Sequence, residues 1–210
     1  LPQFAFKPPV FAPGESVRYN NCAFVLLGLV IERATGVSYR DYVTEHIFRR
    51  AGMHGADFCA MDGICSDLAE HYKRITQNDG TLEWRKNVYS YPPIGSPDGG
   101  ATVTALDLDM FYRAITNYAL VGEDAATLLL TPQVFVKERD GVRVMNGFGF
   151  EFRVGSDDRV VAIEKEGQNA GVAANFAHYP DRDITFVLLA NQDCDVWTIV
   201  REVEPLLLAG

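Results

Sequence analysis

The stretch SVRYNNCAFVLLGLVIERATG, residues 16–36, decides how the rest of the chain is interpreted. No polar side chain interrupts the run from Ala23 to Ile31. Asn20 and Asn21 stand just before this run, where asparagine commonly caps a helix, and Gly36 suits the left-handed residue that ends one. We therefore predict a helix from the Asn20–Asn21 region to Gly36. Its apolar run is expected to be buried, with polar residues held at its N-terminal end.

Composition and charge narrow the class of protein. The 210 residues are 48% hydrophobic and 22% charged, which is typical of a folded domain with a substantial core. The net charge is −9 and the basic residues form no stripe, so we expect no nucleic-acid partner. The apolar run is far shorter than the roughly 20 residues of a membrane span, so we also expect no membrane-spanning segment.

Helical patterns fill the first part of the chain. Capping residues and amphipathic spacing predict helices at residues 39–50, 104–117 and 123–130. Residues 53–103 show little periodicity, so we expect a long loop there with a helical turn at Asp67 to Lys73. Residues from about 19 to 135 are thus expected to form a mainly helical region.

The pattern changes near residue 136. Short Val- and Phe-rich segments separated by turn signals predict antiparallel strands: FGFEFRV, RVVAIEK, ANFAHYP and ITFVLLAN. A last helix at 195–208 is expected to bury Ile199, Val203 and Leu206 against one face of that sheet. The fold class is therefore α+β, with a helical cluster beside an antiparallel sheet covered by a C-terminal helix, and we expect residues 1–210 to be the later part of one domain.

The cysteines do not suggest a metal site. Cys22, Cys59, Cys65 and Cys194 include no C-x-x-C pair and no histidine at zinc-ligand spacing. Cys59 and Cys65 are close enough in sequence for a local disulfide, but we expect ordinary thiols because free cysteines are often buried. We expect neither a metal nor an organic cofactor.

Two other hydrolase mechanisms find little support. Residues 14–18, GESVR, form half of a Gly-x-Ser-x-Gly elbow and lack its second glycine and preceding strand, which disfavours an α/β-hydrolase. No two carboxylates are marked out as a glycosidase pair, and Asp157–Asp158 is interpreted as a solvated turn.

The cleft expected between helices and sheet has candidate residues on both sides. Tyr19 and Asn21 lie at the start of the apolar helix. On the strand side, KEGQNAG, residues 165–171, places Lys165 before two glycines, and glycine lets a strand edge approach a ligand closely.

These residues carry a resemblance to a known family. The stretch from Phe11 to Met53 resembles the segment around the Tyr-x-Asn motif of the serine β-lactamase and penicillin-binding protein superfamily, in particular its class C β-lactamase, D-alanyl-D-alanine carboxypeptidase and esterase branch. DGGATVTALDLDMFYRAI resembles its later Gly-Gly and helix segment, and MNGFGFEFRV its Gly-x-Gly strand. KEGQNAGVAANFAHYPDRDITFVLLANQD resembles its Lys-Thr-Gly strand and the hairpin that follows, so the resemblance spans nearly the whole chain in order.

The resemblance implies a β-lactamase/transpeptidase-like fold and a serine acyl-hydrolase that works through an acyl-enzyme. Tyr19 would be the general base, and Lys165 a cation that favours its ionised form. Tyrosine ionises near pH 10 in water and is a weak base at neutral pH without such a neighbour. Asn21 would bind the substrate, and Gly167 would leave room for it. The backbone N–H of Gln168 would belong to the oxyanion hole. The substrate would be a small-molecule or peptide acyl compound: a β-lactam, peptide or ester.

The first departure from the family concerns the nucleophile, because none of the six serines is followed three residues later by lysine. We therefore expect the Ser-x-x-Lys part of the domain to lie upstream of this chain, and the chain alone to be inactive. The alternative is a non-catalytic member that binds a small acyl or peptidoglycan-like ligand. Missing early strands also predict an exposed sheet edge through which the chain could self-associate.

The second departure is Glu166, which replaces the family's threonine or serine after the lysine. A carboxylate there is expected to disfavour a substrate carboxylate through like-charge repulsion. A neutral ester or amide substrate becomes more plausible for this reason.

Overall fold

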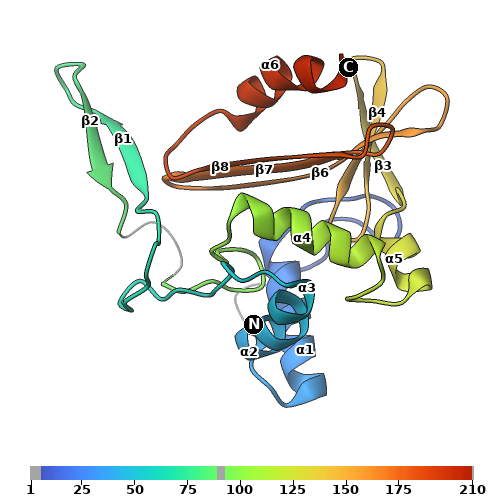
Figure 1. The fold of residues 1–210 in the computed structure, drawn as a ribbon, viewed down its shortest axis with the longest axis horizontal. Helices are drawn as coiled ribbons and strands as arrows, with labels where there is room; N and C mark the ends of the chain where they lie inside the picture. Colours follow the sequence, from blue (N-terminus) through green and yellow to red (C-terminus); the bar gives the residue numbers. More distant parts are fainter. Residues whose placement is uncertain (1–5, 89–92, 210) are drawn as a thin grey trace.

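A six-stranded antiparallel sheet organises the chain in the computed structural model, which describes residues 6–88 and 93–209. The strand order is β3-β4-β5-β6-β7-β8, so each strand pairs with its neighbours in sequence. Helix α6, Val196–Leu208, lies on one face and α4, Ala105–Thr116, on the other (Figure 1). The α+β prediction, with helices beside the sheet and a C-terminal helix covering it, is confirmed. The six strands are Val134–Arg139, Val142–Asn146, Glu151–Val154, Val160–Asn169, Val172–Tyr179 and Ile184–Ala190.

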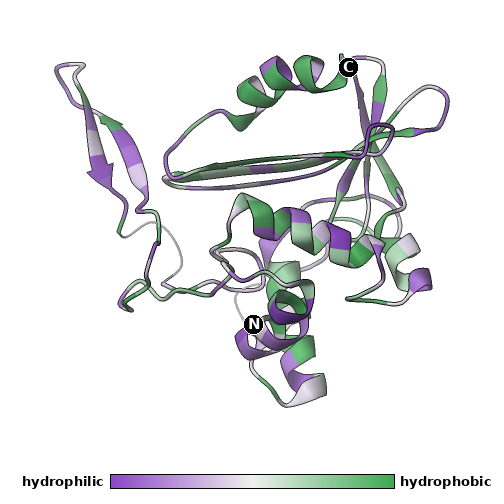
Figure 2. Cartoon of the chain, viewed as in Figure 1, coloured by the Kyte–Doolittle hydropathy of each residue, from purple (hydrophilic) through white to green (hydrophobic). Residues whose placement is uncertain are grey.

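The main core lies between α4 and the sheet. Tyr112 and Ile115 of α4 are buried against Phe150 and against Phe176 of β7, and the rings of Tyr112 and Phe176 are 5.6 Å apart. Thr104 caps α4, and its side chain and that of Asp107 form the expected reciprocal capping box. Strands β7 and β8 are mostly hydrophobic in Figure 2, as burial between two helical layers requires, whereas the second half of β6 is polar.

The second core layer corrects one prediction about α6. Its buried residues are Val196 and Val200, whereas Ile199 is 36% and Leu206 77% exposed. Leu207 and Leu208 pack on the small cluster of Ala162, Ala177 and Tyr179. Apolar residues lie on much of the circumference of α6, so its sequence is compatible with burial of either of two adjacent faces. Contact with the sheet determines which face is buried.

Helix α1, Asn21–Thr35, has the predicted ends. The side chain of Asn20 accepts a hydrogen bond from the backbone of Cys22, and Gly36 adopts the left-handed conformation with φ of 73°. The prediction that its apolar run is buried is wrong in this structure. Among the described residues of α1 only Gly28 is buried, while Leu27 is 58% and Val30 61% exposed. The helix meets the rest of the chain mainly along its Gly28 side, so its apolar side chains project away from that contact.

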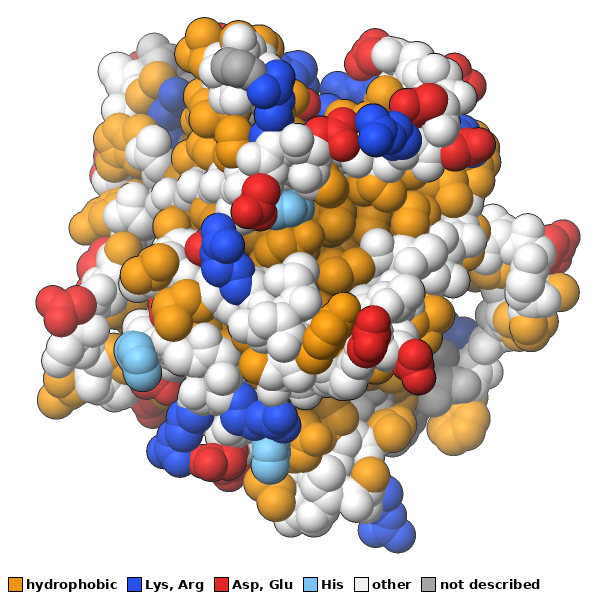
Figure 3. All heavy atoms as spheres, turned by 45° about the vertical axis from the view of Figure 1, so that its right-hand side comes forward, with side chains coloured by type: hydrophobic (Ala, Val, Ile, Leu, Met, Phe, Trp, Pro, Cys, Tyr) orange, Lys and Arg blue, Asp and Glu red, His pale blue; other side chains and the backbone are white. Residues whose placement is uncertain are grey.

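Exposed apolar side chains are not confined to α1. Leu106 is 66% exposed and Phe135 55% exposed, on α4 and β3 respectively. Figure 3 shows apolar side chains over much of one face, with charged side chains between them. Surface area of this kind is typical of proteins that contact a partner surface.

Gly28 gives a prediction about how α1 is held. A Cβ at this position would lie 2.1 Å from Cγ of Pro97, closer than atoms can approach. Gly28→Ala is therefore expected to destabilise the protein by about 1–3 kcal/mol through overpacking. Urea unfolding of the purified protein measures this change. In an open helix the same substitution would stabilise by up to about 1 kcal/mol, so a stabilised variant would contradict the packing. Arg33→Ala, at an exposed site in the last turn of α1, is the control.

The second helical segment begins where predicted, after Ser38. It consists of α2, Tyr39–Val43, the π-helical turn η1, Thr44–Phe48, and α3, Arg49–Ala51. The Ser38 side chain accepts a hydrogen bond from the backbone of Asp41, as the capping pattern predicts. The shorter helix α5, Glu123–Leu129, also lies at its predicted place.

Residues 53–103 are mostly loop, but the helical turn predicted at Asp67 to Lys73 is wrong. A β-hairpin forms instead, with β1 at Tyr72–Thr76 and β2 at Leu82–Lys86. Gly80, with φ of 84°, turns the chain between them. The hairpin projects beyond one end of the large sheet in Figure 1, and at its base the Tyr72 backbone N–H donates to the Asn191 carbonyl just after β8. It is largely hydrophilic in Figure 2, which explains why no hydrophobic pattern marks it.

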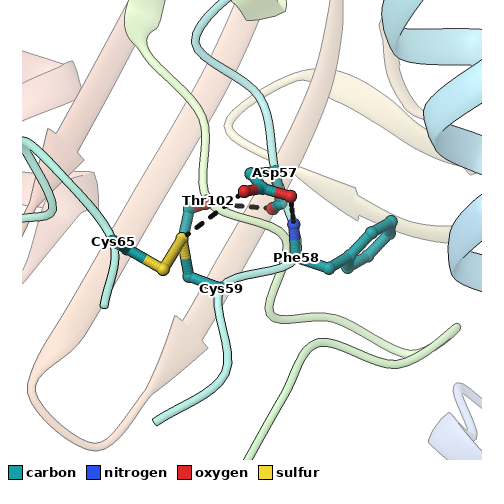
Figure 4. Close-up of a disulfide and its surroundings, with 5 residues drawn as sticks. All are labelled: Asp57, Phe58, Cys59, Cys65 and Thr102. Atoms are coloured by element: carbon teal, nitrogen blue, oxygen red, sulfur yellow. Dashed lines mark hydrogen bonds between the residues drawn. A yellow bond between two sulfur atoms is a disulfide. The ribbon is translucent and has the colours of Figure 1, made fainter. Parts of the chain in front are cut away.

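Cys59 and Cys65 form a disulfide, so the expectation of ordinary thiols is wrong (Figure 4). Two backbone hydrogen bonds between Asp57 and Thr102 fix one end of this loop, and a turn from Ala60 to Gly63 brings the two cysteines together. Cys22 and Cys194 are free thiols. The contact between Asp57 and Thr102 spans 45 residues, so the local sequence does not reveal it.

The sheet contains two strands more than the four quoted segments. Strands β3 and β4 form a hairpin whose outer strand is exposed along its whole length. Because β3 has no buried face, its sequence, VFVKER, does not alternate between apolar and polar residues, and this alternation is what identifies a half-buried strand.

Candidate functional site

The fold brings Tyr19 and Lys165 together from opposite ends of the chain. Tyr19 lies two residues before α1, and Lys165 is near the middle of β6. The Lys165 ammonium nitrogen is 5.0 Å from the centre of the Tyr19 ring. A cation at this distance over an aromatic ring is attracted by the negative face of the ring.

Local contacts place the Tyr19 ring. It packs on Phe24, one turn into α1, with ring centres 5.8 Å apart. Asn20 caps the helix between them through a 2.9 Å hydrogen bond from the Cys22 backbone. Asn21 is the first residue of α1, and the cap is provided by its neighbour Asn20. The residue Tyr19 is 60% exposed.

Lys165 has an acidic partner that sequence reasoning missed. Its ammonium nitrogen is 3.5 Å from Oε1 of Glu151, at the start of β5. Both side chains are partly exposed, so this ion pair is screened and contributes little to stability. The sequence feature that could have indicated this partner is Glu151 itself, the one acidic residue in the segment FGFEFRV.

Strand β6 extends beyond its partner β5 at this point. The pairing with β5 covers Val160 to Glu164, whereas the pairing with β7 continues from Ile163 to Asn169. Within the described ranges, the segment from Lys165 to Asn169 therefore has no strand on its β5 side. An extended ligand could hydrogen-bond to such an edge.

Gly167 and Gln168 lie on this open segment and are exposed. A Cβ at Gly167 would have the Ala174 side chain as its nearest contact, at 4.0 Å. Gly171 has a different, structural role. It adopts φ of 76° in the β6–β7 turn, and a Cβ there would lie 3.2 Å from the backbone of Tyr72.

Glu166 points to the other side of β6 from Lys165. Its carboxylate accepts a hydrogen bond from the indole N–H of Trp197 on α6. Sequence reasoning identified Glu166 but not Trp197, because their contact spans 31 residues. Successive side chains of a strand face opposite sides, which accounts for the separation of Lys165 and Glu166.

The described residues contain neither a cluster of metal ligands nor a single membrane-spanning helix. They contain no group of three or more His, Cys, Asp or Glu side chains that could hold a metal ion. No single helix among them is long and apolar enough to cross a membrane. The helical segments Asn21–Thr35 and Tyr39–Ala51 reach that length and hydropathy only together, and they meet at a bend of 83°.

Comparison with known proteins identifies the family. The family model described as Beta-lactamase matches residues 3–196. Penicillin-binding protein 4* of Bacillus subtilis (strain 168) is 24% identical over 197 residues, which are 88% of this chain and 42% of that protein. The structure of a penicillin binding protein from Bacillus halodurans is 35% identical, with a TM-score of 0.85, over 95% of this chain and 59% of that one.

A third relative shares the fold. The octameric penicillin-binding protein homologue from Pyrococcus abyssi is 24% identical, with a TM-score of 0.79, over 95% of this chain and 44% of that one. The chain spans about half the length of these relatives. The family match covers most of the chain and agrees with the fold, so this chain belongs to the serine β-lactamase and penicillin-binding protein superfamily.

Proposed function

We propose that the protein is a serine acyl-hydrolase acting through an acyl-enzyme, with its nucleophilic serine in a part of the protein that precedes this chain. The observation that carries the proposal is the Lys165 ammonium group 5.0 Å from the Tyr19 ring, at the open edge of β6. A tyrosine beside a cation is suited to act as a base.

The proposed chemistry assigns a role to each candidate residue. The Tyr19 oxygen, as phenolate, takes the proton of the serine hydroxyl while the serine oxygen attacks the acyl carbonyl carbon. The carbonyl oxygen gains negative charge, and the backbone N–H of Gln168 donates to it. The leaving group departs with the proton from Tyr19, and water then releases the acyl group from serine. Asn21 and the space at Gly167 bind the substrate.

One observation favours a second candidate function. None of the six serines in the chain has a lysine three residues later. A protein without that pair would use the same residues at the open edge of β6 to bind a small acyl or peptidoglycan-like ligand without turning it over. The two functions differ in whether a covalent adduct forms.

The test is covalent labelling of the protein expressed from its complete gene. Incubation with a fluorophosphonate is expected to add one phosphonyl group to one serine. Intact mass spectrometry measures the added mass, and peptide mapping locates the modified serine. Lys165→Met is expected to slow labelling at least about tenfold, because a charge-assisted interaction worth about 1.5–3 kcal/mol is lost. Lys137→Met, on the exposed strand β3, is the control. An unlabelled protein would favour the ligand-binding function.

Self-association remains part of the proposal. Among the described strands, β8 ends the sheet order, so one of its backbone edges has no partner strand of this sheet. Edges of this kind pair readily with a second chain. The Pyrococcus abyssi homologue is octameric, which is consistent with self-association in this fold.

A further inference from the structure

Glu166 differs from its neighbours on β6 in how it is held. It follows Lys165 directly, lies on the open segment of the strand and is exposed. An exposed glutamate normally samples several rotamers and leaves its charge in solvent. Here the indole N–H of Trp197 donates to the Glu166 carboxylate, so the charge has a defined position.

The Trp197 side chain is itself held at a fixed helix end. It is the second residue of α6, whose N-cap is Asp195. The Asp195 carboxylate accepts from the backbone N–H groups of Trp197, at 3.1 Å, and Thr198, at 3.2 Å. Val196, between cap and indole, is only 5% exposed. Cap and buried valine therefore fix the start of the helix that presents the indole to β6.

The face of the sheet on which the Glu166 side chain lies is polar around this residue. Its partner in the β6–β7 register is Asn175, so the two side chains lie on the same face. Asn175 is fully buried, and neither its amide nitrogen nor its oxygen has a hydrogen-bond partner within the described part of the chain. A carboxylate is thus accommodated beside a buried amide and an indole donor, rather than against apolar side chains.

A ligand on the open edge of β6 would meet both faces of the strand. Lys165 is on one face, with Glu151 beside its ammonium group, and Glu166 is on the other. The charge of Lys165 is thus only partly balanced, across an ion pair that is itself partly exposed. The Glu166 carboxylate accepts a hydrogen bond from a neutral indole, so this contact does not cancel its negative charge.

We propose that Trp197 is a positioning residue that fixes the Glu166 carboxylate at the substrate edge, and that this pair selects neutral or cationic acyl substrates over those with a carboxylate near the reacting bond. The inference rests on the proposed acyl-hydrolase function. Like charges a few ångströms apart repel appreciably where solvent is partly excluded. Substrate selection by Glu166 needs its charge to stay in place, which is the role of the indole hydrogen bond.

The experiment compares substrates that differ by one carboxylate, in the protein expressed from its complete gene. The first pair is phenyl and 3-carboxyphenyl phenylacetylglycinate, which differ in the leaving group. The second is phenyl hexanoate and monophenyl adipate, which differ in the acyl group. The measured quantity is the ratio of kcat/KM for the anionic substrate to that for the neutral one, in unchanged protein, Glu166→Gln, Trp197→Phe and the double variant.

Glu166→Gln is expected to raise this ratio about fivefold or more in at least one pair, mainly by lowering KM for the anionic ester. Trp197→Phe is expected to raise it about twofold to fivefold, and to have no further effect once Glu166 is glutamine. Trp84→Phe, on the β1–β2 hairpin, is the matched control and should leave the ratio unchanged.

The outcomes separate this inference from the function on which it rests. Turnover with the same ratio in all four proteins would overturn the inference alone. An effect of Trp197→Phe that persists in the Glu166→Gln background would also overturn it, because tryptophan would then act by another route. Absence of both turnover and fluorophosphonate adduct in the unchanged protein would overturn the proposed function and this inference together.

Discussion

Tyr19→Phe is expected to slow serine acylation in the complete protein by about 10²–10⁴-fold, the range in which a positioned general base contributes. The substitution removes one hydroxyl oxygen and leaves the ring in contact with Phe24 and beneath the Lys165 ammonium group. Because the ring is 60% exposed, the loss of its hydroxyl leaves no buried polar group unpaired. The measurement is the rate of fluorophosphonate labelling, together with kcat and KM for a neutral ester.

The kinetic constants of Tyr19→Phe distinguish a general base from a residue that only binds substrate. A residue that only binds substrate changes KM, whereas a base lowers kcat and kcat/KM together. Tyr118→Phe, at a tyrosine that is 49% exposed beyond the end of α4, is the matched control and should label at the normal rate. If Tyr19→Phe also labels at the normal rate, tyrosine is not the base.

Tyr19 and Lys165 should also act as a unit. If the role of Lys165 is to favour the ionised form of Tyr19, its removal has little further effect once the hydroxyl is gone. The double variant Tyr19→Phe, Lys165→Met is then expected to be about as slow as Tyr19→Phe alone. Two independent effects would instead multiply.

Features fixed by neighbours in sequence could be predicted from the sequence. The ends of α1 follow from Asn20 and Gly36, and the start of α4 from Thr104 and Asp107, which bond within three residues. Strands β5 to β8 are short segments rich in Val, Ala and Phe that lie between turn signals, and this composition made them recognisable. The order of helices and then strands gave the α+β class.

Features set by distant contacts could not be predicted. The partners Glu151 for Lys165 and Trp197 for Glu166 come from other elements, and no local pattern identifies them. The burial of α1 shows the same limit. Its apolar run specifies a helix with surface to cover, but the side that packs is set by contacts with other segments, such as Gly28 with Pro97 and Glu32 with the Tyr39 backbone.

A buried ion network beneath α6 gives the largest expected effect on stability. Arg153 of β5 lies 3.1 Å from Glu164 of β6 and 2.7 Å from Glu204 of α6, measured from its guanidinium nitrogens to their carboxylate oxygens. The guanidinium carbon is also 5.9 Å from the centre of the Tyr179 ring. Arg153 is thus the cation that joins two strands to the covering helix.

Arg153→Met is expected to destabilise the protein by about 3–5 kcal/mol at pH 8, because it leaves two carboxylates under α6 without their cation. Urea unfolding measures the change. Arg143→Met is the matched control on the neighbouring strand β4, where the ion pair with Asp158 is largely exposed and is worth at most about 1 kcal/mol. A loss as small as that of the control would contradict the role assigned to Arg153.

The pH dependence of this loss provides an independent check. Burial raises the pKa of Glu164 from its ordinary 4.5 to about 6, even though Arg153 favours the charged form. A group whose pKa rises on folding stabilises the folded state fully below about pH 4.5, and this contribution is lost as the pH rises through 6. The difference corresponds to about 2 kcal/mol. Without Arg153 the charged form is still less favourable, so Arg153→Met should cost less at pH 5 than at pH 8. Adding Glu164→Gln should remove most of this pH dependence, and a cost that is equal at both pH values would show that Glu164 does not titrate in this range.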